Sequence, residues 1–159
     1  MSTPQERGFE PATGDGPEFS EGTEVRIAEV RTAFEGMLQI RRLTGADHAD
    51  PEGVPAPWEL NRPLRAVALA LEAAGIPASA VGASGERVIT GYRVCDGEAP
   101  GSVRVEWTGP PGSGAAHDAE EALARCVTTL RRLGWTALLY RGPRRRRFLE
   151  VEAPPGARS

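Results

Sequence analysis

Apolar residues recur every three or four positions in three segments of the chain, a spacing typical of amphipathic helices. The segments cover residues 24–43, 62–74 and 116–133. The last two are followed by Gly75 and Gly134. Glycine favours helix termination because it adopts the left-handed conformation without steric cost. We therefore predict three helices with these ends.

Strand patterns follow the second and third of these helices. Residues 102–108 alternate between apolar and charged side chains, a period of two that is typical of a half-buried antiparallel strand. Residues 87–95 are rich in β-branched side chains, and residues 136–141 and 146–152 flank the turn-forming pair Gly142-Pro143. The pattern predicts two β-hairpins.

The order helix, strand, strand thus occurs twice, and this repetition predicts the fold. We expect an α+β domain in which a four-stranded antiparallel sheet carries two helices on one face, arranged as an α-β-β pseudo-repeat and preceded by an extra N-terminal helix. The predicted organisation is a disordered acidic tail (1–22), the N-terminal helix (23–45), a linker (46–57), the α+β domain (58–152) and a C-terminal tail (153–159).

The N-terminal region raises two expectations. Residues 1–22 contain Phe9 and Phe19 but no apolar periodicity, so we expect a disordered segment whose removal leaves stability unchanged. The helix over residues 24–43 carries a wide apolar stripe, which either packs on the domain or meets a partner helix. Packing on the domain is the favoured interpretation, and oligomerisation through this helix is the alternative.

Composition places the chain in a broad class. Its 159 residues suit one domain with tails, and its 19 glycines and 14 prolines indicate long loops. No apolar run is long enough for a membrane helix, no secretory signal is visible, and two cysteines are too few for a disulfide scaffold. We expect a soluble cytoplasmic protein with no membrane association.

All 19 basic residues are arginine, and the chain contains no lysine and a single asparagine. This bias indicates a GC-rich genome, which we interpret as bacterial. It weakens any functional argument from arginine enrichment alone, because an arginine here can stand where another genome would encode lysine.

Charge is distributed unevenly behind a net value of only −3. Residues 1–24 hold six acids and one arginine, whereas residues 123–147 hold eight arginines and no acid. Five of these arginines fall within residues 141–147, at the tip of the predicted second hairpin, and an aromatic residue flanks them on each side. Arginine forks bind carboxylates and phosphates, so this cluster is the strongest candidate binding surface. The predicted binding residues are Tyr140, Arg141, Arg144, Arg145, Arg146, Arg147 and Phe148, with Arg131 and Arg132 extending the patch.

The alternation of side chains between the two faces of a strand constrains the position of this hairpin. Arg145 and Arg147 share the parity of the apolar residues Leu149 and Val151. A buried strand would not tolerate them without partners, so we expect the hairpin to project beyond the sheet or to twist. A solvated hairpin, or a docking site for the acidic tail, are the plainer alternatives.

Potential catalytic motifs are incomplete. Residues 109–114 have the glycine spacing of a phosphate-binding loop, but Ala115 and Ala116 stand where lysine and a hydroxyl residue are needed. Ser84 lies in a segment whose spacing departs from a nucleophile elbow. His117 and Glu121 supply at most half of a metal site, and acids are in any case favoured at a helix N-terminus.

The two cysteines have different expected roles. Cys126 lies on an apolar helix face and is interpreted as a core residue. Cys95 would be reactive only if it were exposed beside a positive charge, which Arg93 or Arg87 could supply. We therefore predict no catalytic residue, no metal ligand and no cofactor.

These observations favour a non-enzymatic binding or regulatory module that acts through protein–protein contacts, with an acidic protein surface as partner. Nucleic-acid binding through residues 141–147 is the first alternative, although a pI near 5.5 counts against it. A small hydrolase or transferase is the second alternative.

One stability prediction follows from the strand pattern alone. Trp107 shares its parity with Val103 and Val105, so its side chain should face the helices. Trp107→Ala should lower the free energy of unfolding by about 3–5 kcal/mol, as aromatic truncations in cores do. Chemical denaturation measures this, and near-wild-type stability would mean that Trp107 faces solvent.

Overall fold

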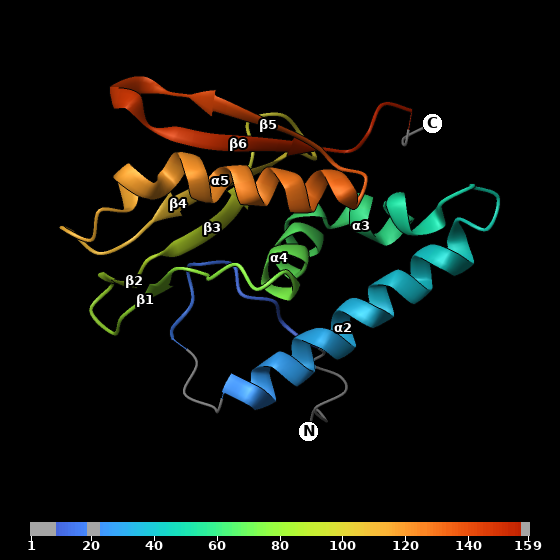
Figure 1. The fold of residues 1–159 in the computed structure, drawn as a ribbon, viewed down its shortest axis with the longest axis horizontal. Coiled ribbons are helices and arrows are strands. Elements are labelled where there is room, and N and C mark those ends of the chain that lie inside the picture. Colours follow the sequence, from blue (N-terminus) through green and yellow to red (C-terminus); the bar gives the residue numbers. More distant parts are fainter. Residues whose placement is uncertain (1–8, 19–22, 157–159) are drawn as a thin grey trace.

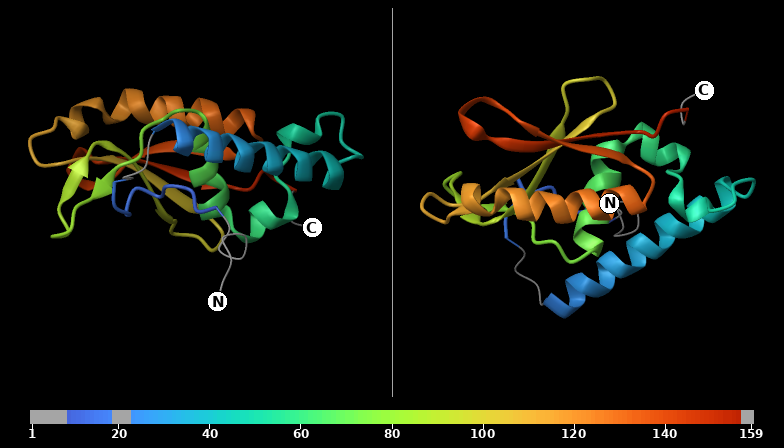
Figure 2. Two further views of the ribbon diagram at one scale, coloured as in Figure 1. Left: turned by 90° about the horizontal axis from the view of Figure 1, so that it is seen from below. Right: turned by 45° about the horizontal axis from the view of Figure 1, so that its top comes forward.

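A computed structural model describes residues 9–18 and 23–156 (Figure 1). The predicted α+β fold is confirmed: one antiparallel sheet has the strand order β3-β4-β6-β5, and α4 and α5 cover one of its faces (Figures 1 and 2). In chain order the elements are α2 (Thr23–Thr44), a 3-10 turn (Pro51–Gly53), α3 (Pro57–Asn61), α4 (Pro63–Ala73), β1 (Ala80–Val81), β2 (Arg87–Ile89), β3 (Gly91–Asp96), β4 (Val103–Thr108), α5 (Ala115–Arg132), β5 (Thr136–Arg141), a second 3-10 turn (Pro143–Arg145) and β6 (Arg147–Glu152).

The core lies between the sheet and these two helices. Alternate strand residues face the helices, and in the middle of the sheet they are fully buried, which is the arrangement that the period of two predicts. Trp107 packs on the margin of this core and is partly buried. The main buried side chains are Tyr92, Val94, Val103, Val105, Leu149 and Val151 of the sheet, Val67 and Leu71 of α4, and Leu123, Cys126 and Leu130 of α5.

The two halves of the sheet have the same arrangement of strands. Strands β4 and β6 are central, β3 and β5 are edges, and Val94, Val105, Leu149 and Leu139 form one row across the sheet. Both helices also end alike. Ile76 and Trp135 each donate a backbone hydrogen bond to the carbonyl five residues earlier, at 3.2 and 3.1 Å, beyond Gly75 (φ +82°) and Gly134 (φ +88°).

The predicted strand 87–95 is divided in two. Strand β2 pairs with β1 in a separate small sheet, and only Gly91–Asp96 joins the main sheet. Gly91 is the first residue of β3. The backbone of Pro77 and Ala78 passes so close to it that a side chain there would collide with them. That segment lies against the edge of β3, where Tyr92 donates to the Pro77 carbonyl at 2.9 Å.

Residues 9–18, which we call the strap, differ from the predicted disordered tail; residues 1–8 and 19–22 lie outside the described residues. The strap follows the outer edge of β3, where the Val94 amide donates to the Thr13 carbonyl at 2.7 Å. The Tyr92 hydroxyl donates to the Ala12 carbonyl at 2.8 Å. Backbone hydrogen bonds and ion pairs hold this segment, so apolar periodicity could not reveal it.

Helix α2 packs across α4, as the favoured interpretation of its stripe expected (Figure 1). Val30 and Met37 are buried with Leu69 of α4, whereas Ile27 and Leu43 are exposed. At the N-terminal end of α2, Arg26 forms an ion pair with Glu72 of α4 at 2.7 Å.

A buried ion pair joins the C-terminal end of α2 to the rest of the domain. The Arg41 guanidinium donates to both carboxylate oxygens of Glu59 in α3, at 2.6 and 2.7 Å, and both side chains are fully buried. Its remaining nitrogen, Nη1, donates to the carbonyls of Glu52 and Leu133, each at 2.7 Å. One arginine therefore connects α2, the predicted linker, α3 and the end of α5.

We expect Glu59→Gln to lower the free energy of unfolding by about 3–5 kcal/mol, because it leaves the buried Arg41 charge uncompensated. The double variant Arg41→Met/Glu59→Leu should recover part of this loss, since it removes both charges. Urea denaturation of the three proteins tests this. A change below about 1 kcal/mol for Glu59→Gln would contradict a buried, fully paired site.

The ion pairs of the strap predict a pH dependence. Burial raises the pKa of the Asp15 carboxyl, but hydrogen bonds from Arg87 and Arg93 outweigh it and hold the pKa below its ordinary value of 3.8. A depressed pKa contributes stability that is present above the ordinary value and is lost as pH falls through the lowered one. The stability advantage of the wild type over Asp15→Asn should therefore be constant above about pH 5 and shrink towards pH 3. An advantage that does not change with pH in denaturant titrations would place Asp15 outside these ion pairs.

Candidate functional site

The β5–β6 hairpin carries the predicted arginine cluster. Its strands pair in continuous register, and the Gly142 amide closes the loop by donating to the Arg146 carbonyl at 2.6 Å. At the tip, Arg144 adopts a left-handed backbone conformation (φ 60°). The β4–β6 pairing ends at the pair Glu106–Phe148, although β4 itself continues to Thr108. Strand parity predicted that Arg147 would reach water, but its side chain is mostly buried and pairs with Glu120 of α5.

Aromatic and charged side chains line the face of the hairpin that points away from the helices. Tyr140 and Phe148 face each other in register and stack, with ring centroids 5.8 Å apart. The Arg104 guanidinium lies 4.0 Å from the Phe148 ring centroid, a cation–π contact, and pairs with Glu150 at 3.1 Å. Tyr140 stays 45% exposed. This part of the predicted site is thus an open aromatic surface beside positive charge.

On the helix-facing side, Arg141 and Arg147 stand opposite each other and share one acid. Their guanidinium groups lie 3.7 and 3.6 Å from the carboxylate of Glu120 in α5. The Arg141 side chain is 70% exposed and that of Arg147 is 23% exposed. Elsewhere in the described chain, every ion pair is 3.1 Å or shorter. The hairpin is therefore a region of weakly compensated positive charge.

The remaining predicted residues separate into two groups. Arg144 and Arg146 are exposed at the tip, and neither has an ion-pair partner among the described residues; Arg145 lies in the turn between them. Arg131 and Arg132 instead lie at the far end of β5, where the Arg131 side chain donates to the Ala137 carbonyl at 2.9 Å. They do not extend the patch at the tip, because α5 ends where β5 begins (Figure 1).

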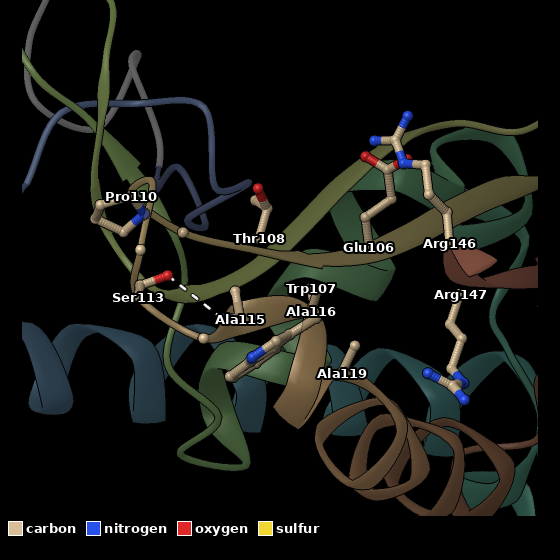
Figure 3. A pocket seen from close by; sticks show the side chains of 13 residues that line it. Glu106, Trp107, Thr108, Pro110, Ser113, Ala115, Ala116, Ala119, Arg146 and Arg147 are labelled. Atoms are coloured by element: carbon tan, nitrogen blue, oxygen red, sulfur yellow. Dashed lines mark hydrogen bonds between the residues drawn. The ribbon is translucent and has the colours of Figure 1, made fainter. Parts of the chain in front are cut away.

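A cleft of about 370 Å³ lies where β4 continues past β6. Figure 3 shows the helix-side residues Trp107 and Arg147 pointing towards α5, and Glu106 and Arg146 pointing the other way. The glycine-rich loop 109–114 forms the opposite wall. Nothing in the sequence links this loop to the arginine hairpin, and the fold places both around one cleft. The cleft can take a polar or anionic group that protrudes from a larger partner.

The other candidate residues have ordinary surroundings. Burial raises the pKa of the Cys95 thiol, and the nearby Arg93 guanidinium offsets this only in part. Burial also raises the pKa of the Cys126 thiol to about 12, in agreement with its predicted core position. His117 and Glu121 are exposed on α5, and the described residues contain no group of three or more metal-ligating side chains.

Comparison with protein-family models, with curated proteins and with solved structures finds no match for this chain. In the part of the chain that the structure describes, no helix is long and apolar enough to cross a membrane. The function must therefore be argued from the site itself.

Proposed function

We propose that the protein is a binding module that recognises an acidic segment of a partner protein through the β5–β6 hairpin. The observation that carries the proposal is the weak compensation of the hairpin's positive charge. Arg141 and Arg147 share Glu120 at 3.7 and 3.6 Å, and Arg144 and Arg146 have no ion-pair partner among the described residues. The other ion pairs of the described chain are 3.1 Å or shorter. Carboxylates of a partner would complete the hydrogen bonds of these guanidinium groups.

The surroundings of the hairpin favour a protein over a polyanion. Leu138, Leu139 and Tyr140 are exposed on the adjoining strand, so basic and apolar contacts lie side by side. The same open sheet face also carries the acids Glu106 and Glu150. A continuous phosphate backbone would be repelled there, whereas a peptide can match mixed charge along its length.

Nucleic-acid binding is the second candidate, and the stacked Tyr140–Phe148 pair is the observation that favours it. Exposed aromatic rings beside arginines are surfaces on which unpaired bases stack. The two candidates differ in salt dependence. Affinity for a single-stranded oligonucleotide should fall steeply with salt through counterion release, whereas affinity for a short peptide with few charges should fall less.

The exposed tip arginines provide the direct test. The double variant Arg144→Gln/Arg146→Gln should bind a synthetic peptide of alternating Glu and Val about tenfold more weakly than the wild type, which corresponds to roughly 1.4 kcal/mol. Fluorescence anisotropy of the labelled peptide measures the affinity. Thermal stability should change little, because both side chains are exposed and unpaired among the described residues.

A matched control separates the hairpin from overall charge. Arg62→Gln/Arg125→Gln removes the same charge from exposed positions elsewhere and should bind the peptide as the wild type does. Equal losses in both variants would reduce the effect to net charge and contradict a hairpin site. Binding of an oligonucleotide but not of the peptide, again dependent on Arg144 and Arg146, would replace the proposal with the second candidate.

A further inference from the structure

Strand β5 is an edge of the sheet, and its apolar side chains are exposed on both faces. It pairs with β6 on one side and has no strand on the other among the described residues. Leu138 is 45% exposed and Leu139 is 39% exposed. Edge strands present unpaired backbone groups that can template a further strand, and proteins usually protect them with charges, bulges or covering segments.

The register shows which backbone groups of β5 point outward. The Gly142 amide bonds to β6, and because inward and outward groups alternate, Leu138 and Tyr140 also bond to β6. The amides and carbonyls of Ala137, Leu139 and Arg141 therefore face away from the sheet. Arg131 confirms this alternation, since it donates to the outward carbonyl of Ala137. The open stretch thus runs from Leu139 to Arg141.

The open edge, β5, and the covered edge, β3, occupy equivalent places in the strand order of the sheet. Leu139 occupies the place in β5 that Val94 occupies in β3, because both stand in the row through Val105 and Leu149. The outward amide of Val94 donates to the Thr13 carbonyl of the strap. The strap carries three acids, and its Asp15 is held by Arg93 of β3 and Arg87 of β2. Among the described residues, none accepts a hydrogen bond from the outward amide of Leu139.

We infer that the β5 edge binds an extended acidic segment of the partner protein as an added strand, in the way that β3 holds the strap. This inference rests on the proposed function, because it takes the acidic partner as given and assigns its binding mode. Arg131 and Arg141 stand near the two ends of the open stretch and would pair with acids of the added strand. Apolar residues between those acids would contact Leu138 and Tyr140 on one face and Leu139 on the other.

A second copy of the chain fits this edge less well than an acidic segment. Two β5 strands paired antiparallel about Leu139 would put Arg141 of each copy opposite Ala137 of the other. Arg131 already lies there, bonded to the Ala137 carbonyl. The pairing would therefore bring like charges together at both ends, which is unfavourable, whereas an acidic strand would turn the same positions into ion pairs.

Amide exchange on the unmodified full chain tests the binding mode directly. With isotope-labelled protein and the alternating Glu–Val peptide, the Leu139 and Arg141 amides should exchange at least about tenfold more slowly when the peptide binds. The Leu138 and Tyr140 amides already bond to β6 and should change little. This alternating pattern is specific to strand addition, because a ligand that merely covers the hairpin would not select every second amide.

A pair of variants supplies the second test. Leu139→Pro removes the outward amide, and an edge strand tolerates proline where its amide faces solvent. Leu139→Ala loses the same side chain but keeps the amide. We expect Leu139→Pro to bind the peptide about tenfold more weakly than Leu139→Ala. Circular dichroism checks that both fold, and if Leu139→Pro does not, the amide exchange of the unmodified protein decides.

The outcomes separate the two levels of the proposal. If the peptide binds with the expected dependence on Arg144 and Arg146 but leaves the Leu139 amide unchanged, strand addition is wrong and the proposed function stands. If the peptide does not bind at all, both are wrong. If sedimentation shows a dimer whose Leu139 amide is protected without peptide, a second copy occupies the edge and the inference is overturned.

Discussion

The ion pair between Arg41 and Glu59 is the contact on which the arrangement of the helices depends. Removing two charges from water is unfavourable unless each is fully paired, and here the guanidinium has four acceptors supplied by three separate segments. One of them, the Leu133 carbonyl, belongs to the open C-terminal end of α5. The pair is satisfied only when α2, α3 and α5 all hold their native positions, so it couples the N-terminal helix to the sheet domain.

The sheet that these helices cover is nearly symmetric in its strands and asymmetric at its edges. At β3, the strap and the segment near Pro77 take up outward amides, and Asp15 neutralises two arginines. At β5, the one comparable contact within the described chain is the hydrogen bond that the Arg131 side chain donates to the Ala137 carbonyl. The sheet thus has one edge covered by the chain itself and one edge with no strand beside it among the described residues.

The arginine hairpin includes this open edge, because β5 is one of its two strands. Most other described ion pairs link one part of the fold to another, as Arg26 does with Glu72. The tip residues Arg144 and Arg146 link nothing within the described chain, and Arg141 is mostly exposed. Exposed Leu138 and Tyr140 lie on the other face of the same edge strand, so charge and apolar area occur together along this edge, the combination that protein interfaces use.

Local patterns in the sequence determined the three long helices, the four strands of the main sheet, the helix-ending glycines and the β5–β6 hairpin, because each depends on periodicity or turn chemistry within a few residues. The short helix α3 and the β1–β2 pair were not predicted. Tertiary structure alone decided the features that join distant segments. The strap leaves no periodic signal because backbone groups hold it, and Arg41 has the pattern of a solvated last-turn cation until Glu59 is folded against it. The cleft and the open β5 edge likewise arise only from which strands become neighbours, which no single segment encodes.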